Sequence, residues 1–278
     1  MNIQEKFNEL KFKEELAFMP YIAAGDPDVE TTVEILNTLI ENGADIIELG
    51  MPFSDPIADG PTIQAASERA LKAGMNTDVY FEICKKVNPK IPVIAMTYYN
   101  IILQYGLLRF AKKCAESGIY GIIVPDLPVE ESEPLLSACK KYNINLIFLV
   151  AQTTTPDRLE KILKHAEGFV YLVSLLGVTG AREEVDKPAS ELVLRVRKKT
   201  ELPLCIGFGI SKEKHVEQLK LNSGVNGVIV GSAIVNIIGE NLGDKEKMLS
   251  ELKNFVRKMK DATLKRKKKV EVYCVSGK

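Results

Sequence analysis

The sequence is poor in histidine and has no excess of charge of either sign. Its two histidines, His165 and His215, fall in segments with the pattern of exposed helices, so we expect no metal site, since such sites commonly use histidine ligands. The 37 Lys and Arg residues equal the 37 Asp and Glu residues, which leaves no overall field to attract nucleic acid or an anionic membrane. Metal-dependent chemistry and nucleic-acid binding are therefore disfavoured from the start.

Long apolar runs and paired cysteines are also absent. No apolar run approaches the ~18 residues that span a bilayer, and the N-terminus lacks the apolar segment of a signal peptide. The five cysteines are odd in number and form no CxxC pair, a pattern typical of reduced, buried thiols. We expect a cytoplasmic protein with no membrane contact.

What the sequence does contain is a series of short apolar runs separated by amphipathic segments. Near-continuous apolar strands between helices are typical of a parallel sheet covered by helices, and 278 residues suit eight such units. We predict a single (β/α)8 TIM barrel. The rival open dinucleotide-binding sheet lacks its fingerprint, because Lys212 stands where Gly207-Phe-Gly209 would need a third glycine. The eight predicted strands are 16–23, 45–50, 91–97, 121–124, 145–150, 169–173, 203–206 and 227–230.

The predicted barrel domain covers residues 1–262, with an added N-terminal helix over 2–14 that could plug the bottom of the barrel. Residues 263–278 form a basic tail that we expect to be flexible. The second and sixth units are longer than the others, and we assign the excess to loops 51–60 and 175–187 after their strands. Loops at these ends of barrel strands build the active site.

Two carboxylates near the second strand are the candidate catalytic groups. Glu48 lies inside an apolar run, on the same strand face as Ile46, where burial should raise its pKa towards neutrality. Asp59 lies on the following Pro-rich loop, should stay ionised, and could stabilise positive charge on a substrate. The plain alternatives are that Glu48 forms a buried ion pair and that Asp59 caps the helix starting at Pro61. A third acid, Asp126, has the pattern of an ordinary helix start.

Other residue types in the strands and at their ends limit the reaction classes that are possible. The predicted strands contain no Lys or His, which disfavours a Schiff-base or metal-dependent aldolase. Glycine-rich turns at 207–211 and 231–233, with a third at 177–180, suit a phosphate cradle of backbone N–H groups, although each could be a tight turn without a ligand. Aromatic side chains near strand ends indicate a flat apolar substrate with a phosphorylated tail, or ordinary core; they are Tyr21, Tyr98, Tyr171 and Phe208.

The chain resembles the tryptophan synthase α subunit family from its first helix to about Met259. The most specific segment runs Glu48-Leu-Gly-Met-Pro-Phe-Ser-Asp-Pro-Ile-Ala-Asp-Gly-Pro-Thr-Ile-Gln64. Further matching segments follow in the same order as in the family: Ala23-Ala-Gly-Asp-Pro27, Pro128-Val-Glu-Glu131, Gly177-Val-Thr-Gly180, Gly207-Phe-Gly-Ile210 and Gly231-Ser-Ala-Ile-Val235.

The resemblance implies aldol-type cleavage of indole-3-glycerol phosphate to indole and glyceraldehyde 3-phosphate. By resemblance, Glu48 moves protons at indole C3 and at the side-chain hydroxyl, and Asp59 stabilises the indole nitrogen. Tyr171 lies beside this pair, Thr179 is a lid residue that contacts the loop acid, and the remaining matches surround the indole ring (Tyr21, Tyr98 and Phe208) or the phosphate (Gly180, Gly209 and Ser232).

The resemblance also implies a partner, a β subunit that carries pyridoxal phosphate and receives indole, in an assembly of two α and two β subunits. This chain itself would bind no cofactor, and Pro52 and Asp55 would face the partner. One departure from the family is Leu175-Leu176 in the sixth loop, where relatives often carry a charged or small polar residue. The alternatives are a free-standing lyase that releases indole, and a non-catalytic barrel that activates a partner.

Overall fold

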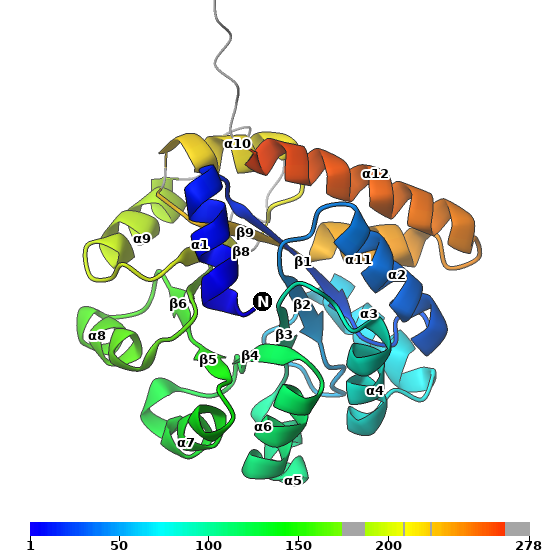
Figure 1. Cartoon of the computed structure of the whole chain (residues 1–278), viewed down its shortest axis with the longest axis horizontal. Coiled ribbons are helices and arrows are strands. Elements are labelled where there is room, and N and C mark those ends of the chain that lie inside the picture. Colours follow the sequence, from blue (N-terminus) through cyan, green and yellow to red (C-terminus); the bar gives the residue numbers. More distant parts are fainter. Residues whose placement is uncertain (174–186, 208, 223, 265–278) are drawn as a thin grey trace, which may run out of the picture.

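The computed structural model of the chain describes residues 1–173, 187–207, 209–222 and 224–264. In this part of the chain, nine parallel strands form one sheet that curls into a barrel surrounded by helices (Figure 1). The strands are β1 (Ala17–Ala23), β2 (Ile47–Gly50), β3 (Val93–Met96), β4 (Ile119–Ile123), β5 (Asn145–Ile147), β6 (Leu149–Ala151), β7 (Val170–Val173), β8 (Leu204–Gly207) and β9 (Gly227–Val230). The predicted (β/α)8 TIM barrel is confirmed.

The fifth predicted strand is the point where the barrel closes. It is split at Phe148 into β5, which pairs with β4, and β6, which pairs with β7. The two halves are the two ends of the strand order β5-β4-β3-β2-β1-β9-β8-β7-β6. One bent segment therefore joins both edges of the sheet, which accounts for nine strands where eight were predicted.

The helices follow the strands, but the second unit departs from the prediction. Its extra length includes a second helix, α4, as well as the loop before α3. The helices are α1 (Ile3–Lys13), α2 (Val29–Glu41), α3 (Pro61–Lys72), α4 (Thr77–Val87), α5 (Tyr99–Tyr105), α6 (Leu107–Glu116), the short 3-10 helix η1 (Val129–Glu131), α7 (Glu133–Lys141), α8 (Pro156–His165), α9 (Lys187–Arg197), α10 (Glu213–Asn222), α11 (Ser232–Glu240) and α12 (Lys245–Thr263).

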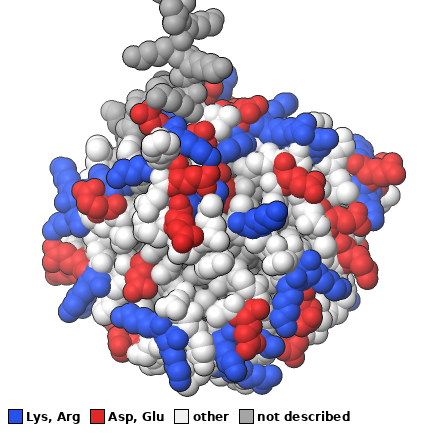
Figure 2. Space-filling view, viewed as in Figure 1, with Lys and Arg blue, Asp and Glu red and all other residues white. Residues whose placement is uncertain are grey.

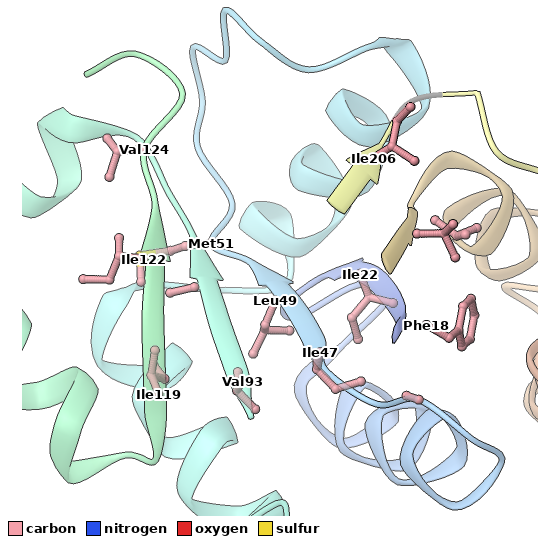
Figure 3. Close-up of a cluster of buried hydrophobic side chains, with 14 of the residues drawn as sticks. Phe18, Ile22, Ile47, Leu49, Met51, Val93, Ile119, Ile122, Val124 and Ile206 are labelled. Atoms are coloured by element: carbon pink, nitrogen blue, oxygen red, sulfur yellow. The ribbon is translucent and has the colours of Figure 1, made fainter. Parts of the chain in front are cut away.

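Side chains of each strand alternate between the barrel interior and the surrounding helices. On β2, Ile47 and Leu49 belong to the large core between strands and helices, where Figure 3 shows them near Ile22 and Phe18. The preceding Ile46 belongs instead to the core inside the barrel. This period of two puts Glu48 on the same strand face as Ile46, as predicted from the sequence, and the structure shows that this face is the barrel interior.

The N-terminal helix α1 lies across one end of the barrel in Figure 1. A capping box between Asn2 and Glu5 starts the helix, and its apolar face buries Ile3, Phe7 and Leu10 in the core inside the barrel. The predicted plug at the bottom of the barrel is confirmed.

A buried ion pair secures the same end. Asp45, just before β2, accepts hydrogen bonds from the Lys260 ammonium at 2.8 and 3.0 Å and from the Phe18 backbone N–H at 2.8 Å. Lys260 belongs to α12, so this pair fixes the last helix to the amino end of the strand that carries Glu48.

The surface of this face mixes both signs of charge. Figure 2 shows acidic and basic side chains interleaved around α1, in keeping with the balanced composition. None of the helices in the described ranges is long and apolar enough to cross a membrane. The tail from residue 265 lies outside the described residues, and the proposed division at residue 262 stays a prediction.

Candidate active site

Glu48 is the buried acid of the barrel interior. Its side chain is 1% exposed, and neither carboxyl oxygen has a hydrogen-bond partner in the described part of the chain. Burial, reinforced by the charge of Asp59, raises the pKa of Glu48 from 4.5 to about 8. The alternative that Glu48 is one half of a buried ion pair finds no cation among the described residues. At neutral pH the group is largely protonated and can give up a proton.

Two buried tyrosines lie close to Glu48. Tyr21 on β1 stands directly opposite Glu48 in the strand register. Burial raises the pKa of both Tyr21 and Tyr171, and the charge of Glu48 adds to the rise in each. Each ring passes over a glycine at the end of a strand, because a β-carbon on Gly50 would overlap Tyr21 and one on Gly207 would overlap Tyr171. The structure thus places two of the four predicted aromatics, Tyr21 and Tyr171, beside the acid.

The glycines beneath these rings are site residues that the sequence analysis did not single out for this role. Gly50 and Gly207 are the last residues of β2 and β8. A glycine that ends a barrel strand next to an inward-facing tyrosine is the signal that could have identified them.

Asp59 is half-buried, on a loop that Tyr98 holds in place. The Tyr98 hydroxyl accepts a hydrogen bond from the Ala58 N–H at 3.1 Å, and the Tyr98 ring stacks on Phe53 with centroids 5.0 Å apart. Burial raises the pKa of Asp59, whereas a hydrogen bond from Tyr98 lowers it. The structure brings Tyr98 to the loop that carries Asp59, a contact that sequence spacing did not reveal.

The capping alternative for Asp59 is wrong. Helix α3 has Gly60 as its N-cap, Pro61 in the first turn and no side-chain cap. Asp126, the third acid, accepts hydrogen bonds from the Tyr99 N–H at 2.9 and 3.2 Å. It therefore caps α5 of the neighbouring unit. Its sequence pattern had suggested instead that it starts the helix that follows it in the chain.

The two glycine turns occupy the ends of β8 and β9, as the sequence predicts. Gly209 has φ +77°, a left-handed conformation that glycine adopts without strain. Helix α11 begins at Ser232 with no side-chain cap. The Ile234 N–H already donates to the Gly231 carbonyl at 2.9 Å, so the N–H groups ahead of it are the ones that could bind an anionic ligand. Three other predicted site residues, Thr179, Gly180 and Phe208, lie outside the described residues. The same holds for Leu175-Leu176, where the sequence departs from the family pattern.

The two residues expected to face a partner differ in exposure. Pro52 is buried within this chain, and Asp55 is exposed, with its carboxylate accepting a hydrogen bond from the Ser54 hydroxyl at 2.5 Å. The same loop carries Ile57, which is 80% exposed. Ser54, Asp55 and Ile57 are therefore the exposed side chains of this loop.

A cavity in the described part of the chain has neither Glu48 nor Asp59 among its lining residues. It measures about 360 Å³ and is lined by residues after β4 and around β5 to β7, including Asp126, Phe148, Leu149, Arg158 and Val173. Among the described residues no group of three or more His, Cys, Asp or Glu side chains could hold a metal ion.

The fold and site define a class. A parallel barrel presents a buried, protonated carboxyl, a second carboxylate on a neighbouring loop and a helix N-terminus at the ends of β8 and β9, which is the arrangement of a barrel enzyme that performs acid–base chemistry on a phosphorylated substrate.

Comparison with known proteins narrows the class to one family. The family described as tryptophan synthase alpha chain matches residues 7–264. The tryptophan synthase alpha chain of Methanosarcina acetivorans is 52% identical over 246 residues, which cover 88% of this chain and 89% of the relative. The tryptophan synthase alpha chain of Methanocaldococcus jannaschii is 50% identical over 256 residues, which cover 91% of this chain and 90% of the relative.

Comparison with solved structures points to the same family. The tryptophan synthase subunit alpha of Legionella pneumophila superposes with a TM-score of 0.87 at 36% identity, covering 95% of this chain and 98% of that one. A Mycobacterium tuberculosis tryptophan synthase structure gives a TM-score of 0.86 at 34% identity, with the same coverage of both chains.

This chain belongs to the tryptophan synthase α chain family. It is a carbon–carbon lyase of tryptophan biosynthesis that cleaves indole-3-glycerol phosphate to indole and glyceraldehyde 3-phosphate. Membership of the family implies a β-subunit partner.

Proposed function

We propose that Glu48 is the proton-transfer group of this cleavage and that Asp59 stabilises the charge that develops on the indole ring. Protonated Glu48 gives its proton to indole C3, and the ring nitrogen gains positive character opposite the Asp59 carboxylate. The Glu48 carboxylate then takes the proton of the adjacent side-chain hydroxyl. The carbon–carbon bond breaks, its electrons restore the aromatic ring, and the former hydroxyl carbon leaves as the aldehyde of glyceraldehyde 3-phosphate. Glu48 ends protonated, ready for another turnover.

One observation supports this assignment above the others: Glu48 is buried, has no partner for either oxygen among the described residues, and has a pKa of about 8. A group with its pKa near neutrality can both donate and accept a proton at modest cost. An exposed glutamate, ionised at pH 7, could only accept.

The other predicted residues would hold the substrate. We assign the indole ring to the neighbourhood of Tyr21, Tyr98, Tyr171 and Phe208, and the phosphate to the backbone of Gly180, Gly209 and Ser232. Thr179 would contact Asp59 when the sixth loop covers the site. No cofactor is required on this chain, because each step is a proton transfer or a bond cleavage assisted by the two acids.

The experiment is indole release from indole-3-glycerol phosphate by the complex with a β subunit. We expect Glu48→Gln to lower kcat by roughly a hundredfold or more, since general acid–base catalysis contributes about 10²–10⁴. Glu41→Gln, at an exposed glutamate that ends α2, is the matched control and should keep parental turnover. Near-parental activity of Glu48→Gln contradicts the proposed proton transfer.

We further propose a cytoplasmic assembly of two α and two β subunits, in which the pyridoxal phosphate is on the β subunit and indole passes directly to it. Exposed Asp55 and Ile57, near the catalytic acid, mark the contact surface. Ile57→Asp should weaken co-sedimentation with the β subunit. Phe12→Asp, at a 91% exposed position on α1, should leave it unchanged.

Turnover with and without the β subunit separates the two remaining alternatives. Strong activation by the partner supports the assembly, whereas equal indole release without it indicates a free-standing lyase.

A further inference from the structure

A buried ion pair near the carboxyl end of β1 has no part in the proton transfers described above. The Arg69 guanidinium donates from Nε to one carboxylate oxygen of Asp26 at 2.7 Å and from Nη2 to the other at 2.9 Å. The Asp26 side chain is 1% exposed and that of Arg69 is 27% exposed. A two-point bond between planar groups fixes orientation as well as distance.

Stability alone is a weak reason for such a pair. Burial raises the pKa of Asp26, and the Arg69 hydrogen bond opposes that rise. Part of the attraction between the two side chains therefore only offsets the loss of hydration of the Asp26 carboxylate. Apolar side chains of similar volume often stabilise a protein as much as a buried ion pair does. Its directional geometry therefore suggests a role in fixing the position of one element relative to another.

The Asp26 end of the pair is rigidly held. The Gly25 N–H donates to the Thr32 hydroxyl at 3.0 Å, and that hydroxyl donates to the Asp28 carbonyl at 2.8 Å. Gly25 has φ +84°, and a β-carbon at this position would collide with the Met75 side chain. The segment after β1 is thus a fixed base for the guanidinium.

The Arg69 end belongs to the helix that continues from the catalytic loop. Helix α3 starts at Pro61, two residues after Asp59, so a rotation or shift of α3 is transmitted directly to that acid. The helix packs against β1 and α11. Nη2 of Arg69 lies 3.6 Å from the place that a β-carbon on Gly239 of α11 would occupy.

We propose that the Asp26–Arg69 pair is a positioning element that sets α3, and through it the Asp59 carboxylate, relative to Glu48. Neither residue touches the reacting atoms. The pair acts on the rate because a misplacement of about 1 Å at a reacting group can cost roughly a hundredfold. The inference rests on the proposed role of Asp59.

The first test compares Arg69→Met and the nearly isosteric Asp26→Asn with the parent, in complex with the β subunit. We expect kcat for indole release to fall roughly ten- to hundredfold. KM should change less than about threefold, because Arg69 meets α11 near Gly239, at the other end of that helix from the phosphate turn at Ser232. Arg69→Lys, which keeps the charge and one hydrogen bond, should lie between the parent and Arg69→Met.

Lys260→Met provides the matched control, since it breaks the buried pair with Asp45 at the opposite end of the barrel. It should lower the melting temperature as much as Arg69→Met does, with kcat of the folded protein unchanged. Equal losses of kcat in both variants would show a general stability effect and overturn the proposal.

A double-mutant cycle separates positioning from any independent effect. In an Asp59→Asn background, where the carboxylate to be positioned is absent, Arg69→Met should have little further effect on kcat. If the two losses multiply, the pair does not act through Asp59. If Asp59→Asn alone is fully active, the proposed role of Asp59 fails first, and the two failures are thereby distinguished.

Discussion

At the scale of single residues, the site is governed by what surrounds Glu48. Removing a carboxyl group from water favours its neutral form, and here that effect raises the pKa to about 8. The same burial carries a cost in stability, because the unfolded chain has no such constraint. The side chain that we propose for proton transfer is therefore also one that destabilises the folded protein.

This cost has a defined pH dependence. The pKa of Glu48 is about 8 in the folded protein and 4.5 when unperturbed, so between these values the folded state holds a proton that the unfolded state has lost. The free energy of unfolding therefore falls as the pH rises through this window. Glu48→Gln removes the effect and should stabilise the protein by up to about 5 kcal/mol near pH 9 and little near pH 5. Thermal unfolding of both proteins at the two pH values measures it; a difference independent of pH contradicts the raised pKa.

Tyr98 controls the loop acid through its hydroxyl. In Tyr98→Phe the Ala58 N–H loses its acceptor and Asp59 loses the hydrogen bond that lowers its pKa. We expect kcat to fall by roughly tenfold and the apparent pKa of Asp59 to rise in the pH profile. Tyr105→Phe is the matched control, because that hydroxyl bonds Asp78 on the surface at 2.9 Å. Unchanged profiles for both variants would show that the hydroxyl of Tyr98 does not hold the loop.

At the scale of elements, apolar period and turn residues predicted most strands and the helix start at Pro61 correctly. Two features escaped this reasoning. The bend at Phe148 follows from barrel closure, since β5 and β6 pair with different neighbours. The fourth strand starts at Ile119, two residues before the predicted 121, because pairing with β3 extends it. Pairing partners far away in sequence decide such boundaries.

Helix α1 offers a test of an element that only plugs the barrel. Phe7 is 5% exposed and packs against Phe169 with ring centroids 5.9 Å apart. Phe7→Ala should lower the free energy of unfolding by about 3–5 kcal/mol. Phe12→Ala, at a 91% exposed position on the same helix, should change it by less than about 0.5 kcal/mol. Urea unfolding compares the two, and equal effects would mean that α1 does not plug the barrel.

At the scale of the whole molecule, the two ends of the barrel have separate tasks. The amino end is closed by α1 and the Asp45–Lys260 pair, and the carboxyl end carries Tyr98, Asp59 and the glycine turns. This division is why a pair at one end can serve as the control for a pair at the other. Loops at the carboxyl end can vary while the barrel itself stays intact.

The balanced charge is also a property of the whole chain. With 37 basic and 37 acidic residues and a pI of about 6.8, the isolated subunit should show net attraction near neutral pH, because little net charge opposes association. Static light scattering should give a lower second virial coefficient near pH 7 than near pH 9. A coefficient that does not change with pH would contradict this expectation.

The sequence by itself determined the barrel, the strand face that Glu48 shares with Ile46 and the glycine turns, because each depends on local periodicity or on residue type. Tertiary structure alone decided that both Glu48 oxygens lack a partner among the described residues, that Tyr98 holds the loop of Asp59, and that Asp26 meets Arg69 across 43 positions of sequence. These features depend on which distant side chains meet when the sheet closes. Local sequence patterns do not encode those contacts.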